Sequence, residues 1–331
     1  MLNNKSILIT GGTGSFGNAF TQYVLENYDP RKIIIYSRDE FKQFIMRNKF
    51  KEYDSKLRFF IGDVRDKDRL KRALEGVDYC VHAAALKQVP ACEYNPTEAI
   101  KTNINGAQNV IDAALDTGVK KVVALSTDKA VNPVNLYGGT KLVSDKLFIA
   151  ANAYAGSKDI CFAVVRYGNV AGSRGSVIPV FHKIIKDGGT ELPVTDHRMT
   201  RFWISLRQGV ELVIKALEES KGGETFISKM PSFKVTDLAK AMLPDGTMRE
   251  IGIREGEKLH EIMVPVEDFP YTYEYDRHFI VYPQMVWSES RRAVPTGKKV
   301  SEGFYYSSDS NTEWLGVEEI RELLGTVELE K

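Results

Sequence analysis

The chain has 331 residues, of which 43% are hydrophobic and 27% charged, and its formal net charge is +1. This composition is typical of a globular protein with room for two domains, and the balanced charge gives no indication of a nucleic-acid or membrane partner. Three widely spaced cysteines, Cys80, Cys92 and Cys161, form neither a disulfide framework nor a zinc motif. Because no apolar run reaches membrane-spanning length, we expect a cytoplasmic enzyme that holds no metal.

A glycine-rich turn follows the first predicted strand, the apolar run 6–9. The stretch 18–27 after the turn is amphipathic and predicts a helix. Glycines permit the tight turn and let backbone N–H groups approach a pyrophosphate at the helix N-terminus. A tight turn without a ligand is the alternative, but the flanking strand and helix favour a dinucleotide site. We expect the cofactor to contact the turn at Gly11, Thr13, Gly14, Ser15, Phe16 and Gly17.

The second predicted strand, 32–36, ends where the ribose of the adenosine half should lie. An acidic side chain at this point accepts a hydrogen bond from a 2′-hydroxyl, whereas arginine suits a 2′-phosphate. Arg38, supported by Ser37 and Lys42, therefore favours NADP. Asp39 is the alternative, as the acid of an NAD site, but we expect it to cap the next helix.

Two further strands are predicted, at 57–61 and 78–81. Asp63 follows the first of them and can accept from the adenine amine, with Val64 giving a backbone contact, or can cap a helix. Ala83 and Ala84 follow the second, and their small side chains let the backbone approach the ribose and the nicotinamide. Lys87 comes next, either as a ligand for a phosphate or substrate hydroxyl or as a solvated loop charge.

The acid–base residues lie directly after a fifth apolar strand. Tyr137 and Lys141 are four residues apart, so they share one face of the predicted helix. An ammonium beside a phenol lowers the pKa of the phenol, which predicts that Tyr137 is a base near neutral pH. Thr127, Asp128 and Lys129 add a hydroxyl, a carboxylate and a second amine at the carboxyl end of the strand. This set exceeds what removal of one hydride and one proton requires.

Strands and helices alternate up to a sixth strand at 160–165, with a long helix predicted over 96–116. The alternation indicates an α/β fold, a Rossmann-like doubly wound parallel sheet whose ligand crevice lies at the carboxyl ends of the strands. We expect residues 1–172 to form the dinucleotide-binding domain, rejoined by about 203–230. Residues 173–331 should form mainly a smaller, substrate-binding domain.

Three loops of the second part carry arginines: Arg174, Arg201 and Arg254. Guanidinium groups bind phosphate oxygens in bidentate fashion, so the three loops together can clamp a diphosphate. Taken singly, each arginine can equally be a surface charge.

The glycine-rich turn together with Tyr137-x-x-x-Lys141 resembles the extended short-chain dehydrogenase/reductases that act on nucleotide sugars. More narrowly, four stretches are similar to the C5-inverting UDP-N-acetylglucosamine 4,6-dehydratases of pseudaminic acid biosynthesis: 84–90, 126–130, 166–170 and 254–261. The resemblance implies tightly held NADP, a UDP-sugar substrate and a homo-oligomer, a dimer or a hexamer. It also implies that Val170 contacts the cofactor. Substrate contacts are implied for residues of the crevice and of the loops beyond it: Lys87, Asn169, Arg174, Val177, Ile178, Thr195, Arg201, Arg254 and Glu257.

The Asp128–Lys129 pair distinguishes members of this group. Retaining 4,6-dehydratases carry Asp-Glu at these positions, 4-epimerases usually carry small or neutral residues, and this sequence matches the inverting enzymes. By the resemblance, Tyr137 takes the proton of the 4-hydroxyl while hydride leaves C4, with Lys141 and Thr127 as hydrogen-bond partners. Neutral Lys129 then removes the C5 proton and protonated Asp128 serves the departing 6-hydroxyl, before hydride returns to C6. A simple salt bridge between the two is the structural alternative.

The sequence leaves three other functions open. A 4-epimerase shares the tyrosine, the lysine and the cofactor, and a retaining 4,6-dehydratase differs in the C5 configuration of its product. A redox-sensing NADP-binding protein without catalysis keeps the glycine-rich turn, but such proteins tend to lose the catalytic pair. Tyr137 and Lys141 are both present here, which favours an enzyme.

Overall fold

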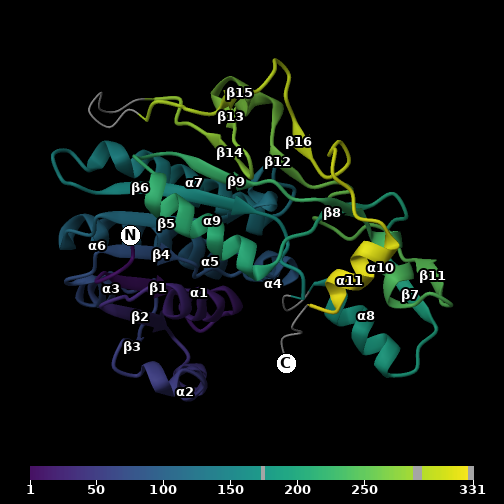
Figure 1. Cartoon of the computed structure of the whole chain (residues 1–331), viewed down its shortest axis with the longest axis horizontal. Coiled ribbons are helices and arrows are strands. Elements are labelled where there is room, and N and C mark those ends of the chain that lie inside the picture. Colours follow the sequence, from purple (N-terminus) through teal and green to yellow (C-terminus); the bar gives the residue numbers. More distant parts are fainter. Residues whose placement is uncertain (173–175, 286–292, 327–331) are drawn as a thin grey trace.

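A ten-stranded sheet forms the centre of the computed structural model, which describes residues 1–172, 176–285 and 293–326 (Figure 1). The strand order is β15-β13-β14-β9-β6-β5-β4-β1-β2-β3, and the strands from β3 to β9 in this order run parallel. The predicted α/β fold with a doubly wound parallel sheet is therefore confirmed. The parallel strands are β1 (Ser6–Thr10), β2 (Lys32–Ser37), β3 (Leu57–Ile61), β4 (Tyr79–His82), β5 (Lys121–Thr127), β6 (Cys161–Tyr167) and β9 (Thr225–Ser228).

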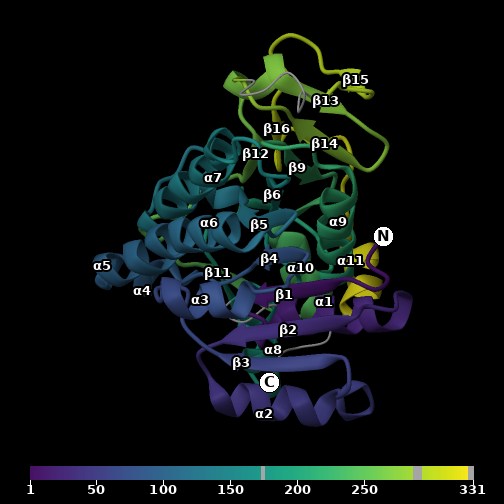
Figure 2. The same ribbon diagram turned by 90° about the vertical axis from the view of Figure 1, so that its left-hand side faces the viewer.

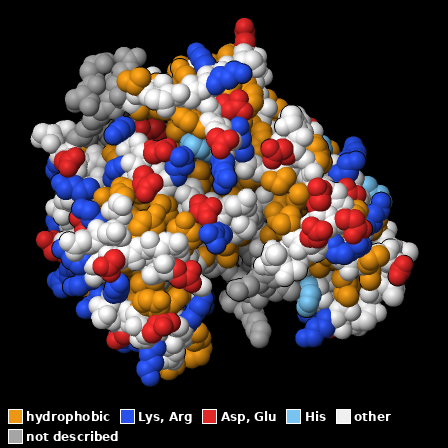
Figure 3. Space-filling view, viewed as in Figure 1, with side chains coloured by type: hydrophobic (Ala, Val, Ile, Leu, Met, Phe, Trp, Pro, Cys, Tyr) orange, Lys and Arg blue, Asp and Glu red, His pale blue; other side chains and the backbone are white. Residues whose placement is uncertain are grey.

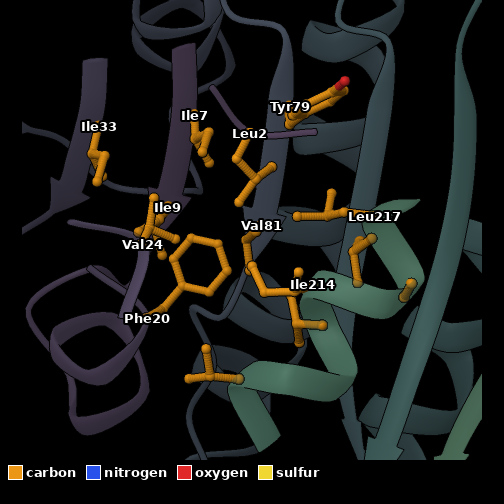
Figure 4. Close-up of a cluster of buried hydrophobic side chains, with 14 of the residues drawn as sticks. Leu2, Ile7, Ile9, Phe20, Val24, Ile33, Tyr79, Val81, Ile214 and Leu217 are labelled. Atoms are coloured by element: carbon orange, nitrogen blue, oxygen red, sulfur yellow. The ribbon is translucent and has the colours of Figure 1, made fainter. Parts of the chain in front are cut away.

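Helices cover both faces of the sheet (Figure 2). On one face lie α1 (Ser15–Asn27) and α9 (Leu206–Glu219); on the other lie α3 (Lys67–Leu74), α6 (Gly106–Thr117) and α7 (Leu136–Tyr154). Successive strand residues point to opposite faces of the sheet. Ile7 and Ile9 therefore pack with Phe20 of α1 (Figure 4). Leu8 points the other way and joins the core beneath α6 and α7. Phe20 is fully buried, and burying such a side chain contributes about 1.5–3 kcal/mol.

Side chains cap two of the helices that border the crevice. Asp39 precedes α2 (Glu40–Lys49) and accepts from the Lys42 backbone N–H at 3.0 Å, as expected. Asn135 precedes α7 and accepts from the Gly138 N–H at 2.7 Å. The amide nitrogen of Asn135 also donates to the Gly256 carbonyl at 2.7 Å. One side chain thus fixes the first turn of α7 and ties it to a loop far along the chain.

The helix predicted over 96–116 is divided into three segments. The segments are α5 (Pro96–Ile100), the π-helical η2 (Lys101–Asn105) and α6. Asn103 lies in η2, where its side chain bonds both backbone groups of Leu86, at 2.8 and 2.9 Å, and donates to the Thr140 hydroxyl at 2.9 Å. The wider π turn therefore lets an interior polar side chain hold the loop after β4 against α7.

Small sheets and three helices form a second unit, whose helices lie on the right of Figure 1. The strand pairs are β7 (Glu191–Val194) with β11 (Thr247–Glu250), β8 (Thr200–Phe202) with β10 (Ser232–Lys234), and β12 (Ile262–Val264) with β16 (Tyr306–Ser307). The helices, which share a separate core, are α8 (Val177–Lys186), α10 (Val235–Met242) and α11 (Val317–Leu324). The remaining short elements are η1 (Lys51–Tyr53), α4 (Val89–Tyr94), η3 (Asp128–Ala130) and η4 (Val266–Tyr271).

The large sheet also takes in chain from beyond residue 172. The helix α9 and the strand β9 correspond to the predicted return near 203–230. Three antiparallel strands, which the sequence did not predict, extend the same edge: β14 (His278–Val281), β13 (Thr272–Glu274) and β15 (Lys298–Lys299). Charged side chains of both signs mix over the face seen in Figure 3. Within the described ranges, no helix is long and apolar enough to cross a membrane.

Candidate active site

A cavity of about 890 Å³ opens at the carboxyl ends of the parallel strands. It reaches from the glycine-rich turn after β1 to Tyr137 and Lys141 on α7. A cavity of this size accommodates a large ligand. Its lining includes all the residues predicted to contact the cofactor: Gly11, Thr13, Gly14, Ser15, Phe16, Gly17, Ser37, Arg38, Lys42, Asp63, Val64, Ala83, Ala84, Tyr137, Lys141 and Val170.

The glycine-rich turn has no room for larger residues. Gly11 has φ +65°, and a Cβ there would lie 2.9 Å from the Ala84 Cα. A Cβ on Gly17 would lie 2.2 Å from the Gly12 carbonyl oxygen. Among the described residues, no side chain caps the start of α1 and none is acidic in its first turn. The backbone therefore offers unblocked N–H groups at a helix N-terminus, which fits a cofactor pyrophosphate.

Charged side chains surround the predicted ribose end of the cavity. Arg38 is exposed, and its guanidinium lies 3.6 Å from Asp63. Arg65 donates to both carboxylate oxygens of Asp63, through its backbone N–H at 2.9 Å and its side chain at 2.7 Å. Burial acts to raise the pKa of Asp63, but these bonds from Arg65 outweigh it and lower the pKa. Asp39 is occupied as a helix cap, whereas Arg38 lines the cavity with its guanidinium beside the Asp63 carboxylate.

Tyr137 lies in the first turn of α7 and is buried. Burial raises its pKa to about 12, although the nearby Lys129 ammonium and a hydrogen bond with Thr127 act in the opposite direction. The prediction that Lys141 lowers the pKa of Tyr137 is therefore wrong for this structure. Spacing along a helix indicates which groups are neighbours, but it does not indicate how much water they lose.

Lys141 is buried one turn further along α7, and burial lowers its pKa. Asp145, a further turn along, acts to raise the Lys141 pKa. Asp145 itself accepts from the Ser126 hydroxyl at 2.5 Å and lies 3.9 Å from Arg166. Asp145 was not among the predicted site residues, although its spacing of four from Lys141 indicates that the two share a helix face.

Asp128 and Lys129 form a salt bridge at the end of β5. The Lys129 Nζ lies 3.1 Å from Asp128 Oδ1 and 3.0 Å from Asn169 Oδ1, and the Thr127 hydroxyl donates to Asp128 at 2.7 Å. Burial opposes both charges, but Lys129 lowers the pKa of Asp128, and Asp128 raises that of Lys129. The pair is therefore charged in this state, as the structural alternative described.

Glu261 and Arg201 extend this cluster from the second unit. Glu261 Oε1 lies 3.5 Å from Lys129 Nζ and 3.6 Å from Arg201 Nε. Arg201 also donates to the backbone carbonyls of Thr200, Lys258 and Leu259, so its guanidinium is held at the cluster. The stretch 254–261 is similar to the inverting dehydratases, but Glu261 itself could not be singled out from the sequence. Nothing near Glu261 in the sequence indicates its contact with Lys129, 132 residues away.

The predicted substrate residues are only partly brought together. Lys87 and Asn169 line the cavity. The others that the structure describes lie outside its lining: Val177, Ile178, Thr195, Arg201, Arg254 and Glu257. Ile178 packs in the core of the second unit, and the Arg254 N–H donates to Glu257 at 3.4 Å. Arg174 lies outside the described residues. The contacts of all these residues with a substrate stay predictions.

Known proteins resemble this chain both in sequence and in structure. The sequence profile of the family described as polysaccharide biosynthesis protein matches residues 7–283. The chain belongs to this family. One relative is the UDP-N-acetylglucosamine 4,6-dehydratase (inverting) of Campylobacter jejuni, 56% identical over 99% of both chains. The UDP-glucose 4-epimerase of Rickettsia canadensis is 44% identical over 99% of this chain and 97% of its own.

Solved structures give the same picture of this family member. Pen from Bacillus thuringiensis superposes with a TM-score of 0.89 at 39% identity, covering 98% of this chain and 99% of Pen. DesIV from Streptomyces venezuelae, a dTDP-glucose 4,6-dehydratase solved with NAD and TYD bound, has a TM-score of 0.69 at 25% identity, covering 77% and 86% of the two chains. The resemblance to nucleotide-sugar enzymes inferred from the sequence is thus confirmed.

Proposed function

We propose that the chain is an inverting UDP-N-acetylglucosamine 4,6-dehydratase, which forms a UDP-2-acetamido-2,6-dideoxy-hexos-4-ulose. The observation that carries this proposal is the Asp128–Lys129 pair, held 3.1 Å apart beside Tyr137. Oxidation at C4 needs only the tyrosine and its lysine, whereas loss of water across C5 and C6 needs a further base and a further acid. The 56% identity to the Campylobacter jejuni dehydratase supports the same assignment.

NADP is the cofactor that this site fits best. The glycine-rich turn would bind the pyrophosphate through backbone N–H groups, and Arg38 would meet the 2′-phosphate. The cap formed by Asp39 argues against its use as the acid of an NAD site. When bound, the nicotinamide supplies a hydride acceptor for C4 of the sugar and later a hydride donor for C6. The enolate left by the second hydride transfer would take a proton from solvent at C5, on the face opposite to the one that lost its proton, which inverts C5.

Tyr137 would take the proton of the 4-hydroxyl. Its pKa of about 12 in the structure means that it needs help from its neighbours. Thr127 can hydrogen-bond the reacting oxygen, and the Lys129 ammonium already acts to lower the Tyr137 pKa. Lys141 lines the same cavity, where its ammonium would hold the phenolate and a ribose hydroxyl.

One proton transfer separates the salt bridge from the acid–base pair that elimination needs. Movement of a proton from Lys129 Nζ to Asp128 Oδ1, over 3.1 Å, gives a neutral amine and a carboxylic acid. The amine would then take the C5 proton, and the acid would give its proton to the departing 6-hydroxyl, which leaves as water. Both residues end charged again, so the elimination restores the salt bridge with which it began.

Incubation with UDP-N-acetylglucosamine in deuterated water tests the assignment. Mass spectrometry and proton NMR should find a 6-deoxy-4-keto product with inverted C5 that carries deuterium at C5. Lys129→Ala should abolish its formation, while Glu274→Gln, which removes a carboxylate remote from the cavity, should leave it unchanged. A product with retained C5 configuration, or full activity of Lys129→Ala, would overturn the proposal.

A 4-epimerase is the second candidate, because the Rickettsia canadensis 4-epimerase is 44% identical over nearly the whole chain. An epimerase returns hydride to C4 and needs no acid or base at C5 and C6. The same incubation separates the two reactions, since an epimerase yields UDP-N-acetylgalactosamine and no 4-keto sugar. The buried Asp128–Lys129 pair favours the dehydratase.

The cellular setting follows from this assignment as part of the proposal. The product would enter synthesis of pseudaminic acid or a related surface glycan, such as one that modifies flagellin, which agrees with the description of the family. Cys80, Cys92 and Cys161 are buried thiols, which suits a reducing cytoplasm. We expect a homo-oligomer, a dimer or a hexamer, which light scattering would measure.

A further inference from the structure

The buried charge cluster around Lys129 contains a carboxylate to which the dehydration mechanism assigns no step. Glu261 is 2% exposed and lies directly before β12, in the second unit. Its backbone is held on both sides by Ser308, whose hydroxyl accepts from the Glu261 N–H at 2.9 Å and whose N–H donates to the Glu261 carbonyl at 2.8 Å. The side chain therefore enters the cluster from a fixed backbone.

The two oxygens of this carboxylate have different surroundings. Oε1 is shared between Lys129 Nζ at 3.5 Å and Arg201 Nε at 3.6 Å. Oε2 is buried and has no hydrogen-bond partner among the described residues. A buried oxygen without a partner costs free energy of folding, so the placement of Glu261 is not explained by stability.

Lys129 has three acceptors around its amine. They are Asn169 Oδ1 at 3.0 Å, Asp128 Oδ1 at 3.1 Å and Glu261 Oε1 at 3.5 Å. A lysine ammonium has three N–H groups, which match this number. After a proton passes to Asp128, the neutral amine keeps two N–H groups, and Asn169 and Glu261 are the acceptors left to hold it. The base thus stays fixed in the form in which it reacts.

We propose that Glu261 is a positioning residue for the base, holding the Lys129 amine at the end of β5 through one oxygen that it shares with Arg201. The inference rests on the proposed 4,6-dehydration. Because Glu261 is buried and does not line the cavity, it acts through Lys129 and not on the substrate. The second unit thereby supplies a part of the site that the Rossmann-like unit lacks.

The sign of the pH effect follows from the charges that face Lys129. These are Asp128 beside it, Glu261 before β12, Arg201 on β8, Tyr137 on α7, and Lys258 in the preceding loop. Asp128 and then Glu261 raise the pKa of Lys129, whereas Arg201 lowers it. Removing the Glu261 charge alone should therefore lower the pKa of Lys129. Because the Asp128–Lys129 pair reacts while it holds one proton, the basic limb of the rate profile, where that proton is lost, should move to lower pH.

The test compares Glu261→Gln, Glu261→Asp and Glu274→Gln with the wild type, measuring kcat and KM for UDP-N-acetylglucosamine against pH. Glu274 is the matched control, a carboxylate 2.8 Å from Lys229 and remote from the cavity. In Glu261→Gln, we expect kcat to fall by about 10- to 100-fold, KM to change little, and the basic limb to move to lower pH. In Glu261→Asp, which keeps the charge on a shorter side chain, kcat should fall while the limb stays in place.

The outcomes separate the two proposals. If the wild type forms no 4-keto product, the proposed function is wrong. If the wild type forms it and Glu261→Gln behaves like Glu274→Gln, or loses activity with an unmoved limb, the role of Glu261 is overturned and the function stands. Should Glu261→Gln not fold, Glu261→Asp decides: wild-type kcat in that variant contradicts positioning, and a reduced kcat with an unmoved limb supports it.

Discussion

Replacing Lys129 by methionine should expose the energetics of the buried cluster. Methionine keeps an unbranched apolar side chain and removes the ammonium that lies 3.1 Å from Asp128 and 3.5 Å from Glu261. The Asp128 and Glu261 side chains are only 2% and 3% exposed. Removing one partner of a buried pair destabilises a protein by about 3–5 kcal/mol, because an unpaired charge stays buried. Arg201 remains beside Glu261 and Thr127 beside Asp128, so we expect about 3 kcal/mol.

The pH dependence of this loss is the sharper part of the prediction. In the wild type the pKa of Asp128 is lowered, so its carboxylate contributes stability above the ordinary unfolded pKa, and that stability is lost as the pH falls through the folded pKa. In Lys129→Met, burial still acts to raise the Asp128 pKa while the main opposing charge is gone. The variant should therefore be destabilised most at neutral pH, and protonation of Asp128 should relieve the destabilisation in acid.

Urea unfolding at about pH 8 and about pH 5 measures both effects. Lys229→Met is the matched control, because Lys229 pairs at 2.8 Å with Glu274, whose side chain is 42% exposed. Such a pair contributes at most about 1 kcal/mol, with little dependence on pH in this range. Adding Asp128→Asn to Lys129→Met should restore part of the lost stability. A loss equal at both pH values, or no larger than that of the control, would refute the reasoning.

Three further predictions concern the first turn of α7, Arg38 and the glycine-rich turn. Gly138→Ala should lower stability and activity, because its Cβ would lie 2.1 Å from the Lys129 carbonyl oxygen. Gly139→Ala is the control: its Cβ would have nothing within 4 Å, so it should keep activity and raise stability by up to about 1 kcal/mol. Thermal unfolding and product assays would measure both variants. Arg38→Ala should weaken NADP binding by about tenfold or more and NAD binding little, since a charge-assisted hydrogen bond contributes about 1.5–3 kcal/mol; equal losses for the two dinucleotides in calorimetry would contradict NADP selectivity. Gly17→Ala should abolish dinucleotide binding in the same assay while the chain still folds, and wild-type affinity would show that the turn does not hold the pyrophosphate.

The parallel half of the fold was predictable because most of its strands are buried on both faces. Such strands are continuous apolar runs. The glycine-rich turn directly follows one of them, β1, and the acid–base residues lie at the end of another, β5. The antiparallel edge carries no comparable signal. β15 is two residues long and β13 three, and pairing with distant chain, not local pattern, defines them.

The same distinction between local and distant contacts decides which site residues could be predicted. Tyr137, Lys141 and the Asp128–Lys129 pair follow from local spacing, and Asp145 would have followed from the same reasoning. Glu261 does not, since it meets Lys129 only when the second unit packs against β5. The pKa of Tyr137 shows a second limit: a sequence gives the neighbours of a phenol, but its burial comes from the whole fold.

The bifunctional amide of Asn135 has a mechanical consequence. By accepting from the Gly138 N–H and donating to the Gly256 carbonyl, it joins the helix that carries Tyr137 to the loop before Glu261. Moving the two halves of the molecule apart at this point would break the hydrogen bond to Gly256 or pull on the side chain that caps α7. A change in their spacing would therefore bear directly on the first turn of α7, in which Tyr137 lies.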